Sequence, residues 1–308
     1  MGQPKLLQAL FLLAMLVAVA CDRKSSAPAR PGARARVASL VPAATDLLIG
    51  MGAGDHLVAI SNYDPHRDET RALPRVGDYQ TFDWEQIAAL RADVMIVFMA
   101  PDRMPPGLSQ RARQLDIRLV NIRTERLSEI LNEIGNLGRA IEEDAKAARA
   151  VDTLRAQIAA AARQTAGRPK ARALIVRDKS AEGVVGRDSF LNDILEAAGG
   201  QNVITASGWP SIDREMLLSL KPEVIIQLLP EASPQVIAEA NRVWTALPQI
   251  PAVARRRVHI LTDWYVQQSG FHVGELAVRF AGLLHPETAQ TRPVLLPSSQ
   301  PTTGEDRK

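Results

Sequence analysis

The sequence predicts an α/β protein of two lobes, each built on a parallel sheet and joined to the other by one long linker helix. The segment Glu85–Ile96 recurs 130 positions later as Glu215–Ile226, and each copy places an apolar helix before a buried strand. Between the copies, residues 128–162 show apolar residues at helical spacing without a proline. Two Rossmann-like lobes would enclose a cleft in which a ligand can bind. Chance similarity between two ordinary helix–strand units is the alternative explanation of the repeat.

The first residues predict export and a lipid anchor. Lys5 precedes an apolar stretch that is too short to span a bilayer. Residues 1–21 resemble a bacterial lipoprotein signal peptide, with Cys21 as the lipidated first residue of a mature chain on the periplasmic side of the cell envelope. Ala18 departs from the Leu usual in that motif, so simple secretion is an alternative. Cys21 is the only cysteine, and without a disulfide partner it has little structural use except as a buried thiol.

Composition separates two polar ends from a folded interior. Residues 22–35 lack apolar periodicity and are rich in Pro, Ala, Ser and Arg, which predicts a flexible tether. Residues 288–308 are expected to form a disordered tail. The hydrophobic content of 46% is enough for two lobes of ordinary size between them. The net charge of +3 gives no case for a nucleic-acid partner, because Lys and Arg are dispersed and are not interleaved with an aromatic platform.

The first lobe, residues 36–124, is expected to contain a parallel sheet. Thr45 is expected to cap a helix that follows the first strand and ends at residues 52–54. Because strands alternate with helices, the sheet should be parallel, with its loops gathered at the carboxyl ends of the strands. The strands are predicted at residues 36–40, 57–60, 94–98 and 119–122.

The linker helix is predicted over residues 125–166. A coiled coil is the alternative, but strict heptads are missing and Ala fills the centre of the apolar seam. The second lobe, residues 167–287, is expected to begin after Gly167. Its predicted strands are at residues 173–176, 224–226 and 258–261.

This order of elements resembles the helix-backbone class (class III) of periplasmic substrate-binding proteins, which serve ABC importers of cobalamin, haem and iron siderophores. The resemblance covers most of residues 36–286. It implies a rigid linker helix, a ligand held between the lobes, no catalysis and no cofactor. The implied partner is an ABC permease dimer with its ATPase subunits. The segments that carry the resemblance are residues 38–48, 74–77, 191–200, 202 and 214–215.

Within this class the chain most resembles the cobalamin-binding branch. Residues 207–215 and 262–265 look like the second-lobe segments of that branch, and residues 62–64 and 78–80 fall where it places first-lobe ligand contacts. A corrinoid has a broad apolar disc with a rim of amides, so its cleft should offer aromatic faces and hydrogen-bonding groups. Each candidate aromatic side chain could instead plug the end of a lobe's core. The aromatic residues that we expect to bind the ligand are Tyr63, Tyr79, Trp209, Trp264 and Tyr265.

Other ligands are alternatives to a corrinoid. Haem or an iron siderophore would suit the same class, and either Tyr63 or Tyr79 could ligate a haem iron. Direct metal binding has weaker support. Of the five histidines, only His66 and His272 lie in predicted cleft loops, with Asp263 as a third candidate ligand. None of them shows the paired spacing of a zinc motif, so no metal site is predicted.

An enzymatic function also has little support. The Gly-containing stretches at residues 50–54 and 183–186 lack the three-glycine spacing that holds a pyrophosphate after a strand. Ser39, Asp64 and His66 could be arranged as a nucleophile set, but no nucleophile elbow accompanies them. A structural lipoprotein of the same fold is the remaining alternative. Saturable binding without turnover would separate a transport protein from both.

The repeat gives equivalent positions to Glu85 and Glu215, each at the start of a predicted helix. A carboxylate there stabilises the helix by a few tenths to about 1 kcal/mol, so one role is helix capping. The resemblance implies another role, because similar family members use a Glu at each of these positions to contact basic pockets on the permease. We therefore expect Glu85 and Glu215 to dock the protein onto its permease.

Overall fold

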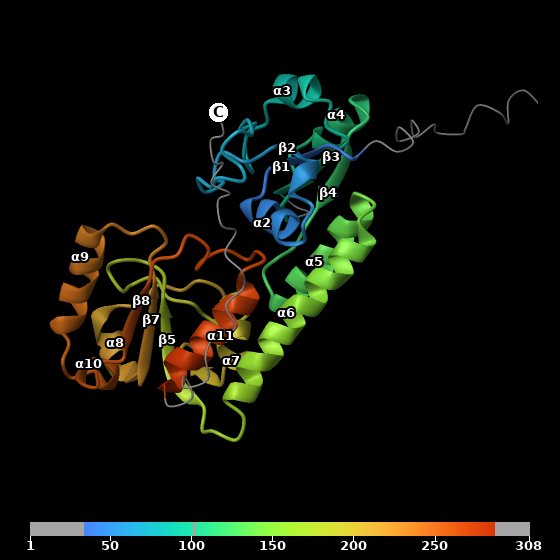
Figure 1. The fold of residues 1–308 in the computed structure, drawn as a ribbon. Helices are drawn as coiled ribbons and strands as arrows, with labels where there is room; N and C mark the ends of the chain where they lie inside the picture. The colour runs from blue at the N-terminus through green and yellow to red at the C-terminus, as the bar shows by residue number, and fades with distance from the viewer. Residues whose placement is uncertain (1–33, 101–102, 287–308) are drawn as a thin grey trace, which may run out of the picture.

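The computed structural model describes residues 34–100 and 103–286, which fold into two α/β lobes (Figure 1). The first lobe contains β1 (Val37–Ser39), α2 (Pro42–Gly50), η2 (Gly54–His56), β2 (Leu57–Ala59), α3 (Trp84–Ala89), β3 (Val94–Val97), α4 (Leu108–Gln114) and β4 (Arg118–Asn121). The second contains β5 (Ala171–Val176), α7 (Phe190–Ala197), β6 (Gly200–Asn202), α8 (Arg214–Leu220), β7 (Val224–Leu228), α9 (Pro234–Thr245), α10 (Pro251–Ala254), β8 (Val258–Leu261) and α11 (Val273–Leu284). Two further helices connect the lobes.

The two sheets are parallel and have the same topology. Their strand orders are β2-β1-β3-β4 and β6-β5-β7-β8. In each sheet, the strand that follows the repeated helix pairs with the first strand of its lobe, β3 with β1 and β7 with β5. The repeat therefore reflects one architecture used twice, and the predicted fold class is confirmed.

Helix α2 begins earlier than the sequence suggests. The prediction that Thr45 caps this helix is wrong, because the helix starts at Pro42 with Val41 as its N-cap residue. Proline suits the first helical position, where its φ is already helical and its missing N–H would have no partner within the helix. Thr45 is instead fully buried, and its hydroxyl oxygen lies 2.9 Å from the Ser39 hydroxyl oxygen.

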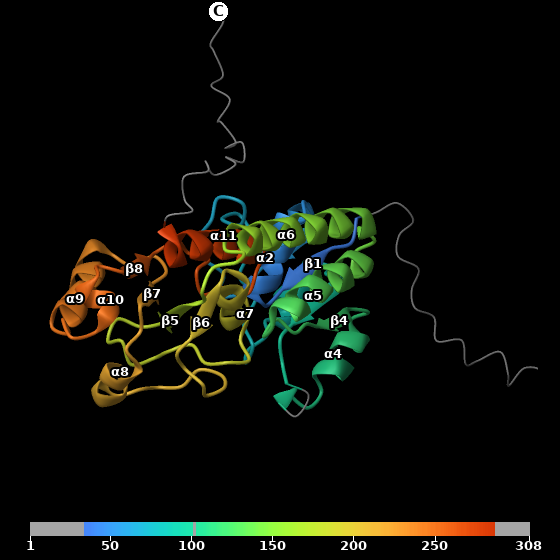
Figure 2. The ribbon, with the colours of Figure 1, turned by 90° about the horizontal axis from the view of Figure 1, so that it is seen from below.

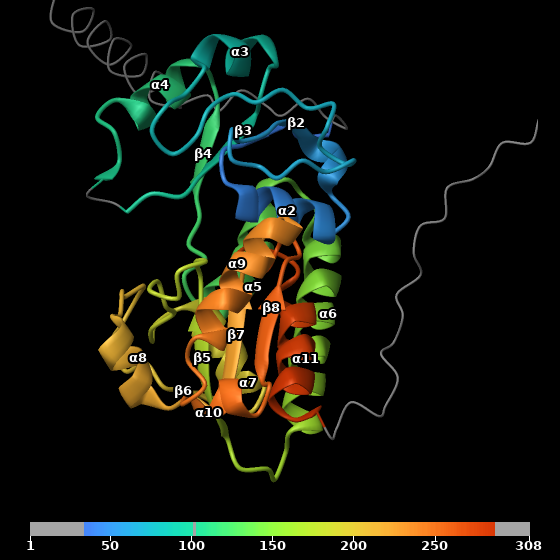
Figure 3. The same ribbon diagram turned by 90° about the vertical axis from the view of Figure 1, so that its left-hand side faces the viewer.

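The range 125–166 does not form one continuous helix, and this part of the prediction is corrected. It folds as a hairpin of α5 (Leu127–Ala140) and α6 (Asp144–Gln164). Glu142 adopts a φ of +61°, and the Glu143 N–H donates to the Gly138 carbonyl at 2.8 Å, as in a Schellman ending. Gly138 also allows close approach of the helices, because a Cβ there would lie 2.4 Å from the Ala147 Cβ. The long linker helix of the fold is α6, which runs past both lobes (Figures 1 and 3).

A shared hydrophobic core extends from one lobe into the other. Its buried members include Leu47 of α2, Leu154 of α6 and Phe280 of α11. Helices α6 and α11 lie side by side in Figures 2 and 3, so the second lobe is packed directly on the linker. Smaller apolar clusters, one in each lobe, pack against the two sheets. Within the described ranges, no helix has the length and apolar character needed to cross a bilayer.

Candidate functional site

A cleft of about 830 Å³ lies at the carboxyl ends of the first-lobe strands and reaches the second lobe. Parallel strands end at one edge of their sheet, so the loops that follow them converge there. Each first-lobe strand is followed by a lining segment, and the second lobe supplies one more. The lining residues are 40–43 after β1, 61, 63, 79 and 80 after β2, 98–100 and 103 after β3, 122–125 after β4, and 267–269 from the second lobe.

Two predicted ligand-binding residues, Tyr63 and Tyr79, form a stacked pair on the cleft wall. Their ring centroids are 5.9 Å apart with 25° between the planes, and the residues are 61% and 55% exposed. Asp78 joins their loops by accepting hydrogen bonds from the Gln80 N–H at 2.8 Å and the Asn62 side-chain amide at 3.3 Å. The Gln80 N–H is the main reason that the pKa of Asp78 lies below its usual value. The pair is thus a preorganised aromatic surface.

Trp209 lies on the second lobe and is not part of the cleft lining, although it is 48% exposed. The Arg177 guanidinium, directly after β5, lies 4.3 Å from the centroid of the Trp209 ring. Gln267, which lines the cleft, donates to the Arg177 carbonyl at 2.9 Å. One arginine therefore connects Trp209 to the second-lobe wall of the cleft.

Trp264 and Tyr265 pack between the lobes and do not line the cleft. The Tyr265 ring stacks on His272 with centroids 4.4 Å apart, and its hydroxyl donates to Glu275 at 2.8 Å. Burial, together with that hydrogen bond, raises the pKa of the Tyr265 hydroxyl. The Arg67 guanidinium lies 4.4 Å from the centroid of the Trp264 ring. The structure does not bring these two residues together with the tyrosine pair.

A buried carboxylate on α2 holds the second lobe against the first. Asp46 is 1% exposed and accepts hydrogen bonds from the Arg67 Nη1 at 2.9 Å, the Phe271 N–H at 2.6 Å and the His272 Nδ1 at 3.1 Å. The backbones approach closely, because a Cβ on Gly270 would lie 2.2 Å from the Asp46 Oδ2. These contacts fix the segment that also supplies cleft residues 267–269.

Glu85 and Glu215 lie exposed in the first turns of α3 and α8. The helix N-termini are capped by other residues, since Asp83 accepts from the Gln86 N–H at 2.9 Å and Asp213 accepts from the Met216 N–H at 2.7 Å. Within the described part of the chain, neither glutamate side chain has a hydrogen bond or ion pair. Neither glutamate therefore makes a capping hydrogen bond, and what remains of the capping role is the favourable charge of a first-turn carboxylate near the helix N-terminus.

A family model for periplasmic binding proteins matches residues 37–264 of the chain. The chain belongs to this family. This periplasmic binding protein is 27% identical over 190 residues to the vitamin B12-binding protein of Vibrio parahaemolyticus, covering 61% of the chain and 68% of that relative. It is 26% identical over 238 residues to the vitamin B12-binding protein of Salmonella typhimurium, covering 76% and 84%. The resemblance seen in the sequence is confirmed, and the protein is a transport binding protein and not an enzyme.

Solved structures share the fold of this periplasmic binding protein. The periplasmic vitamin B12 binding protein BtuF of Vibrio cholerae superimposes with a TM-score of 0.67 at 24% identity, covering 84% of this chain and 99% of that one. The periplasmic haem-binding protein HutB of Vibrio cholerae gives a TM-score of 0.70 at 20% identity, covering 82% and 100%. At these identities the similarity establishes the architecture.

The metal set considered from the sequence is not brought together. His272 contacts Asp46, and Asp263 is paired with Arg279. Over residues 34–100 and 103–286, no three His, Cys, Asp or Glu side chains are grouped closely enough to hold a metal. Ser39 is likewise unsuited to nucleophilic chemistry, because it is buried and its hydroxyl donates to the Val41 carbonyl at 3.1 Å.

Several cleft residues of this periplasmic binding protein were not predicted from the sequence. Phe98 lies in the range predicted as a strand, but β3 ends one residue earlier, and Phe98 and Met99 line the cleft. Their position at a strand end was the available signal. For Gln267 and its neighbours, the available signal was a polar run before α11.

Asp64 gives this binding protein a pH-dependent stability. Burial raises the pKa of Asp64 from its usual 3.8 to about 6, although its carboxylate accepts from the Ser61 N–H at 2.9 Å and the Thr45 hydroxyl at 3.2 Å. The folded state therefore holds this proton at a pH where the unfolded chain has lost it. The stabilisation is complete below about pH 4 and is lost as the pH rises to about 6.

We predict that Asp64→Asn removes the loss of stability that wild type shows as the pH rises from about 4 to 6. The difference in pKa corresponds to roughly 3 kcal/mol, so at pH 7 the variant should be about 1–3 kcal/mol more stable than wild type. Below pH 4 the two should differ little. Urea unfolding between pH 4 and 7 measures the difference, with Asp55→Asn as the exposed control. Parallel pH profiles for wild type and Asp64→Asn would show that burial of Asp64 has no such effect.

Proposed function

We propose that this periplasmic binding protein captures a corrinoid in its cleft and delivers it to the permease of an ABC importer. The observation that carries the proposal is the stacked pair of Tyr63 and Tyr79 on the wall of a cleft of about 830 Å³. The broad apolar disc of a corrinoid suits two large exposed aromatic faces. Side-chain amides and hydroxyls of Gln80, Gln268 and Ser269 are available nearby for its amide rim.

Two arginines line the cleft, and only one of them is paired with carboxylates within the described residues, since Arg103 has no ion pair there. Arg123 lines the cleft but pairs with Glu125 at 2.8 Å and with Glu129 at 3.4 Å. Relatives named vitamin B12-binding proteins support the same ligand class.

Haem or an iron siderophore is the second candidate ligand. The same tyrosines favour it, because a phenolate oxygen can ligate ferric haem iron. The solved structures that share the fold include proteins described as haem-binding. Tyr63→Phe and Tyr79→Phe separate the candidates, since Phe keeps the aromatic face and removes the iron ligand.

The proposal includes a membrane anchor and a docking surface. Cys21 would carry the lipid. It belongs to residues 1–33, which lie outside the described part of the chain together with residues 101–102 and 287–308. Glu85 and Glu215 would contact the two permease subunits, one from each lobe.

Titration of the purified protein with cyanocobalamin, haemin and ferric siderophores, followed by tryptophan fluorescence, tests the ligand. We expect saturable cyanocobalamin binding that quenches Trp209. Tyr79→Ala and Trp209→Ala should each weaken it by about 1–3 kcal/mol, the scale for losing one aromatic contact. That is about 5- to 150-fold in Kd.

Met216→Ala is the matched control, because Met216 is also exposed and apolar but lies on α8, outside both the cleft lining and the contacts that join Trp209 to it through Arg177 and Gln267. Unchanged affinity in both aromatic variants would contradict the proposed binding surface. Binding of haemin alone would replace the corrinoid and keep the transport function.

A further inference from the structure

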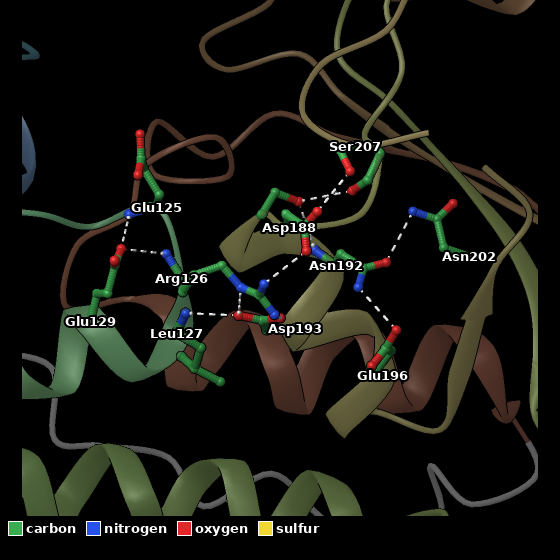
Figure 4. Close-up of polar contacts among 12 residues, drawn as sticks. Glu125, Arg126, Leu127, Glu129, Asp188, Asn192, Asp193, Glu196, Asn202 and Ser207 are labelled. Atoms are coloured by element: carbon green, nitrogen blue, oxygen red, sulfur yellow. Dashed lines mark hydrogen bonds and ion pairs between the residues drawn. The ribbon is translucent and has the colours of Figure 1, made fainter. Parts of the chain in front are cut away.

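Arg126 contacts the second lobe from the end of the first-lobe cleft wall. It directly follows lining residues 122–125 and precedes α5. Its Nε and Nη2 donate to the two carboxylate oxygens of Asp193 at 2.9 and 2.6 Å, and the Leu127 N–H donates to the same carboxylate at 2.9 Å. Its remaining Nη1 donates to Asp188 at 3.0 Å (Figure 4). One guanidinium therefore holds two second-lobe carboxylates at once.

Asp188 extends this contact to the loop that carries Trp209. Its second carboxylate oxygen accepts from the Ser207 hydroxyl at 2.7 Å (Figure 4). The same loop is attached to Arg187 through backbone hydrogen bonds, from the Gly208 N–H to the Arg187 carbonyl and from the Arg187 N–H to the Ala206 carbonyl, both 2.8 Å. Asp188 itself has a φ of +62°, a conformation that Asp and Asn tolerate better than most residues. The ion pair thus acts on the base of the Trp209 loop.

For the contact between Arg126 and Asp188, the arrangement favours a geometric role over a stabilising one. Both side chains are substantially exposed, and exposed ion pairs contribute little to stability because water screens them, whereas Asp193 is largely buried. The planar guanidinium fixes the directions of its N–H groups, which a flexible ammonium does not. Three of those directions are used, two toward Asp193 and one toward Asp188.

We infer that Arg126 is a positioning residue that, through Asp188 and Ser207, sets the place of Trp209 relative to the first-lobe wall of the cleft. Arg126 need not touch the ligand. The role of Trp209 in capture rests on the proposed function, but the position of Trp209 does not.

Incorporation of 5-fluorotryptophan tests the position without any ligand. The chain has four tryptophans, so fluorine NMR should give four resonances, and Trp209→Phe assigns one of them. In Arg126→Gln and in Asp188→Asn, we expect the Trp209 resonance to shift and broaden while the other three stay in place. Asn tolerates the positive φ of Asp188, so the second variant removes the charge without straining the backbone.

Asp116→Asn is the matched control, because Asp116 has a φ of +55° and is exposed. In the described ranges its side chain has no hydrogen bond or ion pair. An unmoved Trp209 resonance in both variants would overturn the inference. So would equal movement of all four resonances, which would indicate a general structural role.

Cyanocobalamin titration of the same variants tests the consequence for capture. We expect Arg126→Gln and Asp188→Asn to weaken binding about 3- to 10-fold, because part of the preorganisation is lost. Arg126→Lys should recover only part of the affinity, since it keeps the charge without the fixed fork. Wild-type affinity for cyanocobalamin in both Arg126→Gln and Asp188→Asn would refute the part of the inference that concerns capture. Failure of the wild type to bind cyanocobalamin would count against the proposed ligand, and the fluorine spectra would still decide the positioning.

Discussion

Asp46→Ala should destabilise the protein by about 3–5 kcal/mol, the cost of removing one partner from a buried ion pair. The substitution leaves the buried Arg67 guanidinium without its carboxylate at 2.9 Å. It also removes the acceptor of the Phe271 N–H and of His272 Nδ1 on the second lobe. The loss is large because neither the charge nor the N–H group can reach water. Urea unfolding at pH 7 measures it.

Asp55→Ala is the control for this substitution. Asp55 pairs with Arg34 at 2.7 Å, but both side chains are exposed, so its loss should cost less than about 1 kcal/mol. Asp46→Asn should fall between the two, because it keeps an acceptor and loses the charge. If Asp46→Ala costs no more than the control, the contact does not hold the lobes together.

Glu85→Ala combined with Glu215→Ala should abolish stimulation of the cognate transporter's ATPase in vesicles. Both carboxylates are exposed, and the neighbouring helix caps are made by Asp83 and Asp213. An importer with two related permease subunits can receive the same contact from each lobe. A charge-assisted pair with Arg would orient the protein as well as bind it. Ligand affinity and melting temperature should stay close to those of wild type.

Glu69→Ala with Glu182→Ala is the matched control for the docking pair. These glutamates are exposed, lie one on each lobe, and change the net charge by the same amount. This control variant should stimulate the ATPase normally. Full stimulation by the Glu85 and Glu215 variant would exclude the docking role, and a collapse of its stability would return both residues to a structural one.

The fold was predictable where local sequence pattern and tertiary environment agree. Buried strands such as β3 and β7 are continuous apolar runs, and the repeat placed them in equivalent lobes. Strand β6 was not predicted, because Gly200–Asn202 has little strand propensity and is a strand through its pairing with β5. The break at Glu142 also lacked a signal, since glycine usually occupies that conformation.

The candidate site was predictable to a smaller extent. Tyr63 and Tyr79 were chosen through the resemblance to the cobalamin-binding branch. The structure places both on the cleft wall, at the edge where loops after parallel strands gather. Tyr265 also follows a strand, but its environment depends on Glu275 and His272 from a later segment. No local pattern shows which aromatic side chain turns into the space between the lobes and which turns into the core.

The core shared by Leu47, Leu154 and Phe280 makes the two lobes a single cooperative unit. We expect the lobes to unfold together, because unfolding one would expose apolar surface of the other that it now covers. Heating should therefore give one calorimetric transition. If a ligand binds mainly to the first lobe, we expect it to protect the backbone amides of β7 from hydrogen exchange as well, since those amides should open only when the whole molecule does.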